Sequence, residues 1–200
     1  MAVIDYGLGN LRSIFNALKK LGAEPLITSD CYLIKNADAV ILPGVGAFKD
    51  AMDNLKSIQN MLVDEILNTK PVLGICLGLQ LMLTESREGG LNKGLNIFRG
   101  SVIRLPETVK APHIGWNTIT IINSGNHIID GLKDNSYFYF VHSYYATGLD
   151  TKLLIAETEY GVRFPSIIGL KNIFATQFHP EKSGENGLKL LTNFIKYVKG

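Results

Sequence analysis

The first half of the chain alternates short apolar runs with segments of helical periodicity. Apolar residues recur at helical spacing from Leu11 to Leu21 before Gly22 ends the pattern, and a second helical pattern covers residues 57–68. Strands that alternate with helices form parallel sheets covered on both faces. The strands expected in this half are 2–6, 24–28, 39–43 and 71–75.

After about residue 96 the pattern changes to strand after strand, which predicts a largely antiparallel or mixed second half. A helical pattern over 184–200 closes the chain, with basic residues at its C-terminal end. With neither a linker nor a repeat in the sequence, we expect a single domain over 1–200. The strands expected in this half are 100–105, 113–122, 137–145, 153–160 and 174–180.

Composition excludes several classes of protein. The chain is 46% hydrophobic and 19% charged, so it buries a core and is not disordered. The net charge is only +2 and the sequence has no run of basic residues, so nucleic acid is not an expected partner. The N-terminus has no export signal and no run of apolar residues is long enough to span a membrane, so we expect a cytoplasmic protein. The two cysteines and four histidines match no metal-binding spacing, and neither a metal nor a cofactor is expected.

One cysteine lies where a strand meets a helix. Cys76 follows the apolar run 71–75 within Gly-x-Cys-x-Gly, and a helical pattern comes after it, which is the layout of a nucleophile elbow. The helix N-terminus favours a thiolate at Cys76, and the N–H of Leu77 points to where an oxyanion would form. The alternative is a small core residue, the interpretation given to Cys31, which lacks flanking glycines.

A thiolate nucleophile needs a base, and the base needs an orienting group. His179-Pro180-Glu181 supplies both, because proline biases His179 to extended conformation and residues i and i+2 of an extended chain point the same way. Taken alone, this tripeptide is also typical of a turn at the end of a strand.

A glycine-bearing loop follows the strand at 39–43. Its residue Val45 is placed to offer the second backbone donor of an oxyanion hole, at the same sheet edge as Cys76. A phosphate-binding loop is the competing interpretation, but the third glycine and the Gly-Lys-Ser/Thr sequence that such loops need are absent.

Together and in this order, PGVGAF, GICLGLQLM and QFHPEKSG resemble the class I glutamine amidotransferase family. Within it, DYGLGNLRS, PHIGWN and FVHSYY most resemble the glutaminase subunits of imidazole glycerol phosphate synthases. The resemblance implies a three-layer, flavodoxin-like, doubly wound α/β sheet. It also implies that Cys76, His179 and Glu181 are nucleophile, base and orienting acid for the hydrolysis of L-glutamine to glutamate and ammonia.

The resemblance further suggests residues that hold the substrate. Gln80 and Glu88 match family contacts to glutamine, and an acid suits the α-ammonium of the substrate. The alternatives are an ordinary helix residue and a solvated charge. His142, Ser143 and Tyr144 resemble the segment that lines the glutamine pocket, although a histidine satisfied within a strand is a competing interpretation of His142.

Ammonia is useful in biosynthesis only if it reaches an acceptor before it becomes ammonium, so the resemblance implies a docked synthase. The expected partner is a cyclase subunit of barrel fold in histidine biosynthesis. Trp116, the only tryptophan, is a candidate for the docking face, and the alternative is that it anchors the hydrophobic core. The candidates for the docking face are Asn10, Trp116, Asn117, Tyr139 and Lys182.

Two other functions stay open at this point. A paralogous glutaminase that supplies ammonia to a different synthase would carry the same triad. A non-catalytic scaffold or redox-sensing domain could use the same fold, since fold does not fix function. It would leave Cys76, His179 or Glu181 free to differ, whereas all three are present.

Overall fold

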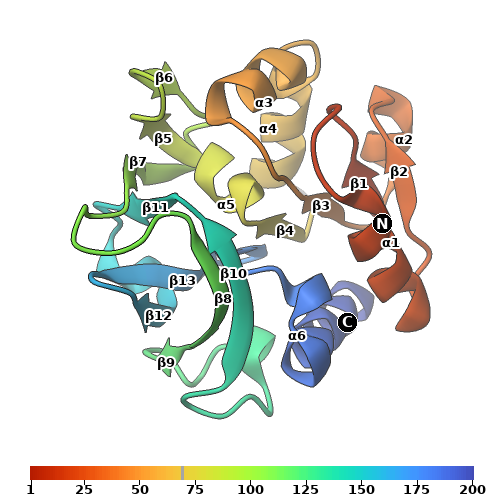
Figure 1. Cartoon of the computed structure of the whole chain (residues 1–200). Helices are drawn as coiled ribbons and strands as arrows, with labels where there is room; N and C mark the ends of the chain where they lie inside the picture. The colour runs from red at the N-terminus through yellow and green to blue at the C-terminus, as the bar shows by residue number, and fades with distance from the viewer. Residues whose placement is uncertain (69) are drawn as a thin grey trace.

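An eight-stranded sheet forms the centre of the computed structural model, which describes residues 1–68 and 70–200 (Figure 1). Its strand order is β2-β1-β3-β4-β14-β13-β12-β9. The first five strands in this order are parallel, and each of the last three runs antiparallel to the one before it. The strands are β1 (Ala2–Ile4), β2 (Leu26–Thr28), β3 (Val40–Leu42), β4 (Val72–Ile75), β9 (Thr120–Ile121), β12 (Leu154–Glu159), β13 (Arg163–Leu170) and β14 (Ile173–Thr176).

Two smaller sheets lie beside the large one. The first is a curved antiparallel ribbon of β8 (His113–Thr118) and β10 (Tyr137–His142), which Figure 1 shows crossing in front of β13. The second has four strands in the order β11-β7-β5-β6. Its strands are β5 (Leu83–Ser86), β6 (Asn92–Lys93), β7 (Phe98–Arg104) and β11 (Tyr144–Thr147).

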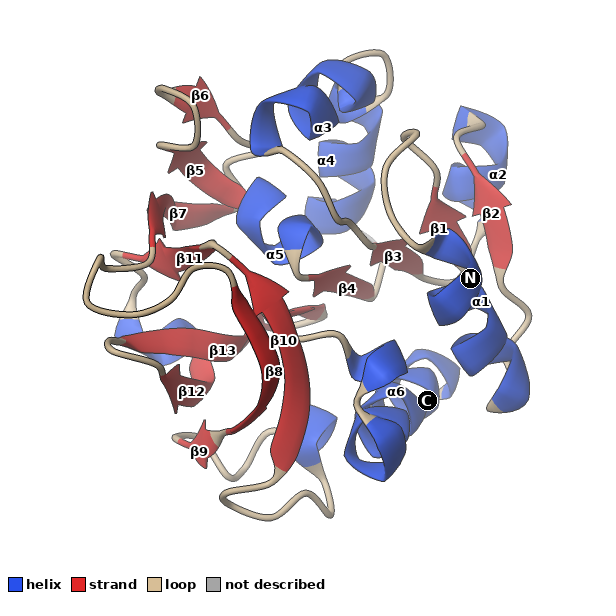
Figure 2. Cartoon of the chain, viewed as in Figure 1, coloured by secondary structure: helices blue, strands red, loops and turns tan. Residues whose placement is uncertain are grey.

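Helices cover both faces of the parallel part of the large sheet, as Figure 2 shows. Side chains of successive strand residues point to opposite faces. Val3 therefore packs in one core cluster with Leu18 and Phe194, while Ile4 packs in another with Phe48 and Leu62. The three layers confirm the predicted flavodoxin-like architecture. The helices are α1 (Leu11–Lys20), α2 (Cys31–Asn36), α3 (Phe48–Leu55), α4 (Gln59–Asn68), α5 (Leu77–Leu81) and α6 (Gly184–Lys199).

Local chemistry sets the limits of α1. The side chain of Asn10 caps its N-terminus by accepting a hydrogen bond from Ser13 N, and Gly22 follows its C-terminus with φ +77°. Lys19 and Lys20 lie in the last turn, where positive charge is favourable. The predicted helices over this segment, over 57–68 and at the C-terminus are confirmed.

Several predicted strands were wrong in detail. The segment 137–145 breaks at Ser143 into β10 and β11, which belong to different sheets, and 113–122 breaks into β8 and β9. The strand predicted over 174–180 ends at Thr176. Sequence analysis missed β13, because Pro165 interrupts its apolar run and a proline counts against a strand. It also missed α2, α3, β5 and β6, which are short.

Candidate active site

Cys76 lies between β4 and α5 in a strained backbone conformation. Its φ of 53° and ψ of −103° are unusual for a residue with a side chain, and Cys76 is the N-cap of α5. The turn is tight because Gly78 packs against β3: a Cβ at this position would lie 1.8 Å from the carbonyl oxygen of Leu42. The Gly-x-Cys-x-Gly pattern thus forms the expected sharp turn and presents a buried thiol at its tip.

His179 reaches the same sheet edge from the neighbouring strand. β14 pairs with β4 in parallel, with Thr176 opposite Ile75, so the residues after these two strands leave the sheet together. Nδ1 of His179 lies 2.9 Å from Oε1 of Glu181, and both side chains are almost fully buried. The predicted contact between the two residues is therefore present.

The local backbone differs from the prediction. His179 is extended, with φ −98° and ψ 97°, but Pro180–Lys182 form a 3₁₀ turn, η3. Proline is favourable at the first position of such a turn, and the hydroxyl of Ser183 donates to the carbonyl of His179 over 2.6 Å. Glu181 meets His179 through this turn and not through an extended strand.

The charges around His179 favour its protonated form. Burial lowers the pKa of His179. The charge of Cys76 and the hydrogen bond and charge of Glu181 outweigh this effect and raise the pKa to about 10. Within the described chain, Nε2 of His179 and Oε2 of Glu181 are buried without a hydrogen-bond partner. The imidazole is thus oriented through Nδ1, and Nε2 is left for proton transfer.

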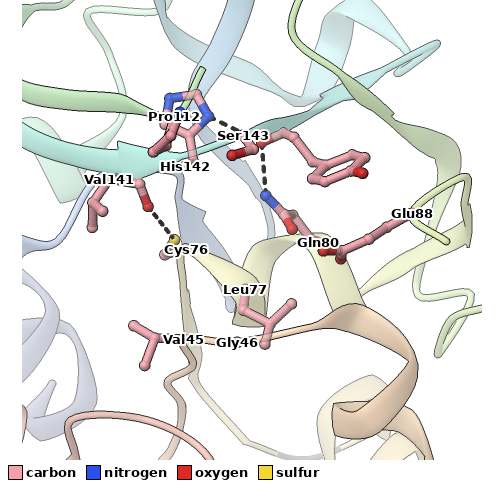
Figure 3. A pocket seen from close by; sticks show the side chains of 11 residues that line it. Val45, Gly46, Cys76, Leu77, Gln80, Glu88, Pro112, Val141, His142 and Ser143 are labelled. Carbon is pink, nitrogen blue, oxygen red and sulfur yellow. Dashed lines mark hydrogen bonds between the residues drawn. The ribbon is translucent and has the colours of Figure 1, made fainter. Parts of the chain in front are cut away.

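A cavity of about 270 Å³ opens in front of Cys76 (Figure 3). Both predicted oxyanion residues and all five predicted substrate-binding residues line it, whereas His179 and Glu181 do not. Three further residues, Gly46, Pro112 and Val141, also line it; they lie within PGVGAF, PHIGWN and FVHSYY but were not predicted as site residues. The residues predicted to line it are Val45, Cys76, Leu77, Gln80, Glu88, His142, Ser143 and Tyr144.

The loop that carries Val45 is fixed against the nucleophile turn. The hydroxyl of Tyr6 donates a hydrogen bond to the carbonyl of Pro43, and burial raises the pKa of Tyr6, so this donor stays protonated. A Cβ at Gly44 would lie 2.9 Å from Cβ of Leu77. The two segments predicted to supply oxyanion donors are thus in direct contact. Sequence analysis missed Tyr6 because its partner is 37 residues away.

Gln80 is buried and its amide is held on both sides. Nε2 donates to the carbonyl of Tyr144 over 2.9 Å and to Oε1 of Gln177 over 3.3 Å. Both amide hydrogens are therefore used, and only Oε1 of Gln80 can take part in substrate binding, as an acceptor. Sequence analysis missed Gln177, which is fully buried.

Glu88 lies at the opposite side of the cavity from Cys76 in Figure 3. Its Oε2 accepts a hydrogen bond from the backbone N–H of Phe48 over 2.9 Å, at the start of α3. Ala47, the N-cap of α3, has no side-chain acceptor, so Glu88 fills that role. The carboxylate is thus fixed in place with its charge at the cavity.

His142 is part of a buried pair of histidines. Its Nδ1 faces the carbonyl of Tyr144 at 3.0 Å and its Nε2 faces Nδ1 of His113 at 3.1 Å. A carbonyl only accepts, so Nδ1 of His142 carries a hydrogen, Nε2 accepts, and His113 donates. Burial lowers the pKa of His142 to about 3 and that of His113 to about 4, so both rings are neutral. This network holds the segment of β10 and β11 that lines the cavity.

The predicted docking residues come from four segments of the chain. Trp116 and Tyr139 are paired across β8 and β10 with ring centroids 6.0 Å apart, and Trp116 is 55% exposed, so it is not a core anchor. Asn10 is an exposed helix cap and Lys182 is a half-buried residue of η3.

Asn117 does not share the face of Trp116. Its Nδ2 donates to the carbonyl of Glu159 over 3.0 Å and lies 3.4 Å from Nε2 of His113, on the opposite side of the strand. The exposed face instead includes Ile114, opposite Val141, and sequence analysis did not single out either residue.

The described residues contain neither a metal-binding cluster nor a membrane-spanning helix. Over 1–68 and 70–200, no group of three or more His, Cys, Asp or Glu side chains is arranged to hold a metal ion. In the same part of the chain, no helix is both long and apolar enough to cross a membrane.

The family model of glutamine amidotransferase class-I matches residues 2–197. A protein of Methanothermobacter thermautotrophicus named imidazole glycerol phosphate synthase subunit HisH is 50% identical over 199 residues, which are 100% of this chain and 99% of that protein. The protein of the same name from Caldanaerobacter subterraneus is 50% identical and covers 100% of this chain and 98% of its own length. A solved structure titled glutamine amidotransferase superposes with a TM-score of 0.76 at 18% identity, covering 100% and 99% of the two chains, which shows the shared fold.

Proposed function

Because this chain belongs to the class-I glutamine amidotransferase family, we propose that it is the glutaminase subunit of an imidazole glycerol phosphate synthase. It hydrolyses L-glutamine and passes the ammonia to a synthase subunit. The observation that carries this proposal is the position of Cys76, a strained and buried thiol that lines a cavity, with the oriented imidazole of His179 just beyond the end of the adjacent strand β14.

The reaction begins with attack of Sγ of Cys76 on the amide carbon of glutamine. A tetrahedral oxyanion forms, and the backbone N–H groups of Leu77 and Val45 are the proposed donors to it. Protonated His179 gives its proton to the departing ammonia, leaving a thioester on Cys76. Water, deprotonated by the same imidazole, then attacks the thioester and releases glutamate.

One histidine performs both steps because its environment changes during the reaction. The charge of Cys76 raises the pKa of His179 while the enzyme is free, which keeps the imidazole protonated for the first step. Acylation removes the negative charge from sulfur, and the pKa of His179 falls. The imidazole that remains after ammonia has left is therefore suited to act as the base.

The cavity supports binding of a small zwitterion. Glu88 presents a fixed carboxylate to the α-ammonium group, and Oε1 of Gln80 is available as an acceptor. His142, Ser143 and Tyr144 line the same cavity.

The partner docks on the exposed face of the β8 and β10 ribbon. Ile114 and Trp116 are 60% and 55% exposed there, and large exposed apolar side chains on one face mark interaction sites. The carbonyl of Val141, on the same ribbon, lies 3.7 Å from Sγ of Cys76, so this face is next to the reaction centre. A cyclase subunit of barrel fold is the proposed occupant.

A glutaminase assay with and without the synthase tests this function. We expect slow glutamine hydrolysis by the isolated chain and faster hydrolysis when the cyclase subunit of its imidazole glycerol phosphate synthase is bound and loaded with ligand. Activation by a different synthase alone would support the paralogous glutaminase. Equal rates with and without every synthase would contradict a dedicated partner.

A further inference from the structure

Gln177 is a buried residue beside the nucleophile for which the mechanism above has no role. It lies just beyond the end of β14 and two residues before His179, and it is 0% exposed. Its Nε2 lies 3.7 Å from Sγ of Cys76, within hydrogen-bond distance for sulfur. Because one end of an amide donates hydrogen bonds and the other accepts them, its effect on sulfur depends on which end faces Sγ.

The hydrogen-bond network fixes the orientation of this amide. The carbonyl of Tyr144 only accepts, so the group of Gln80 that faces it at 2.9 Å is the NH₂ group. The same NH₂ lies 3.3 Å from Gln177, whose facing atom must therefore be the acceptor Oε1. Nε2 of Gln177 is then at the far side of the amide plane, directed at sulfur. Two amides in series thus place a donor on Sγ of Cys76.

The carbonyl oxygen of Val141 is the second polar group beside Sγ, and it favours the neutral thiol over the thiolate. The carbonyl of Val141, at 3.7 Å, accepts a hydrogen bond from a thiol but repels a thiolate. When Cys76 loses its proton, this contact turns unfavourable, and the N–H of Gln177 becomes a charge-assisted hydrogen bond. The donor at Gln177 therefore favours the ionised nucleophile specifically.

We propose that Gln177 is a further catalytic residue, whose side-chain amide donates a hydrogen bond to Sγ of Cys76 and stabilises the thiolate. It acts twice in the proposed glutaminase reaction, on which this role in turnover rests. It stabilises sulfur before attack on glutamine and again when the thioester carbon–sulfur bond breaks and sulfur leaves with the electron pair. Gln80 is the positioning residue that keeps the donor end of Gln177 toward sulfur.

Alkylation of Cys76 tests the proposal without glutamine. The chain carrying Cys31→Ser, which removes the exposed second cysteine, is treated with iodoacetamide over a range of pH and the rate at Cys76 is followed by mass spectrometry. In Gln177→Met, which keeps side-chain length but has no donor, we expect the midpoint of the rate against pH to rise by about one unit. Gln177→Glu, which presents an acceptor to sulfur, should raise it further.

The matched control is Gln59→Met, the same substitution at a half-buried position in α4, which should leave the midpoint unchanged. In the complex with the synthase, Gln177→Met should lower kcat about tenfold with little change in KM, because the amide contacts sulfur and not glutamine. A midpoint equal to that of the Cys31→Ser chain in both Gln177 variants would overturn the proposal.

If a substitution at the buried Gln177 prevents folding, an NMR measurement on the chain with Gln177 intact still tests the hydrogen bond. The side-chain amide of Gln177, followed by ¹⁵N NMR in the Cys31→Ser protein, should shift with the same pH midpoint as alkylation and lose that titration once Cys76 is alkylated. An amide resonance that does not respond to ionisation of Cys76 would contradict the hydrogen bond. If the chain proves not to hydrolyse glutamine while the midpoint shifts as expected, the proposed function fails and the Gln177 contact stands.

Discussion

His179 shows how a single residue is adjusted for two tasks. Burial lowers the pKa of His179, yet Cys76 and Glu181 together raise it to about 10. In the proposed mechanism, the contribution of Cys76 disappears on acylation, whereas that of Glu181 persists through Nδ1. Under this proposal, Glu181 sets how strong a base the imidazole is in the second half of the reaction, and Cys76 sets how strong an acid it is in the first.

Replacing Glu181 should move the alkaline limit of activity. In Glu181→Gln the negative partner of His179 is lost, so the imidazole should lose its proton at lower pH, and the alkaline limb of kcat/KM should fall by about 1–3 units. The pH profile of glutamine hydrolysis in the synthase complex measures this. Glu185→Gln, an exposed acid in the first turn of α6, is the control and should keep the parent profile. An unshifted limb in Glu181→Gln would mean that Glu181 does not govern the acidity of His179.

The neutral pair His113 and His142 should make stability depend on acid pH. Burial lowers the pKa from 6.5 to about 4 for His113 and to about 3 for His142. Between these values and 6.5, the unfolded chain therefore binds more protons than the folded chain. The free energy of unfolding should therefore fall as pH drops from 6.5 toward 4. His113→Gln should lessen the drop between about pH 7 and about pH 5 by roughly 1 kcal/mol in urea unfolding. His127→Gln replaces an exposed histidine and is the control, which should show the same drop as the parent protein. An equal drop in the two variants would contradict the neutral pair.

At the scale of elements, the site depends on the register of β4, β14 and β3. The first two bring Cys76 and His179 off the same edge of the sheet, and β3 leads into the loop that carries Val45. α5 must begin directly after β4 for the thiol to be exposed to the cavity, and this requires the backbones of α5 and β3 to approach closely at Gly78. The catalytic geometry is thus set by strand pairing together with one glycine.

Adding a single methyl group at that glycine should disrupt the turn. In Gly78→Ala, the new Cβ would overlap the carbonyl oxygen of Leu42, so the helix or strand must shift and the protein should lose about 3 kcal/mol of stability. Denaturant unfolding checks this. Gly125→Ala is the matched control, since the nearest atom to its Cβ lies at an ordinary 3.6 Å. Equal stability of the two variants would show that the turn tolerates a side chain.

Local patterns in the sequence predict the elements that follow local rules. The Gly-x-Cys-x-Gly turn, the capped α1 and the amphipathic α6 depend on residues close together in the chain. β13 escaped prediction because Pro165 pairs in the sheet beside an irregular stretch of β12, where the ladder tolerates it. The turn η3 depends on Ser183 bonding back to His179, which extended-chain reasoning did not include.

The site was predictable from sequence to the extent that its residues lie in motifs. Cys76, His179 and Glu181 fall in short patterns, and the structure places them as neighbours at one sheet edge. Tyr6, Gln177 and His113 contact the site through partners 37, 101 and 29 residues away, and only the tertiary fold brings them there. Asn117, a docking candidate suggested by resemblance, has its side chain hydrogen-bonded to the carbonyl of Glu159, a contact that the sequence motif does not reveal.

At the scale of the whole molecule, the exposed face of β8 and β10 links the reaction centre to its surroundings. This ribbon forms its own two-stranded sheet and is attached to η3 by hydrogen bonds from His179 N to the carbonyl of Tyr139 and from Tyr139 N to Ser183 Oγ, each 2.9 Å long. A partner that presses on Trp116 and Tyr139 would thus act on the segment that holds His179. The proposed docking face and the proposed catalytic histidine thus share one structural unit.

Trp116 should report on docking directly. Trp116 is the only tryptophan, so burial of its exposed ring by the synthase should shift the emission of this chain to the blue. Trp116→Ala should weaken the complex by about 2 kcal/mol, roughly 30-fold in Kd by calorimetry. Tyr32→Ala, which removes an exposed aromatic ring from α2, should leave Kd unchanged. Parent affinity in Trp116→Ala would place the docking face elsewhere.

The central claim, that Cys76 is the nucleophile that attacks glutamine, is tested most directly by covalent labelling with a diazoketone analogue of glutamine followed by peptide mass spectrometry. We predict one adduct per chain, on Cys76 alone, with complete loss of glutaminase activity, and neither adduct nor activity in Cys76→Ala. An adduct on Cys31, or full glutamine hydrolysis by Cys76→Ala in the synthase complex, would contradict it.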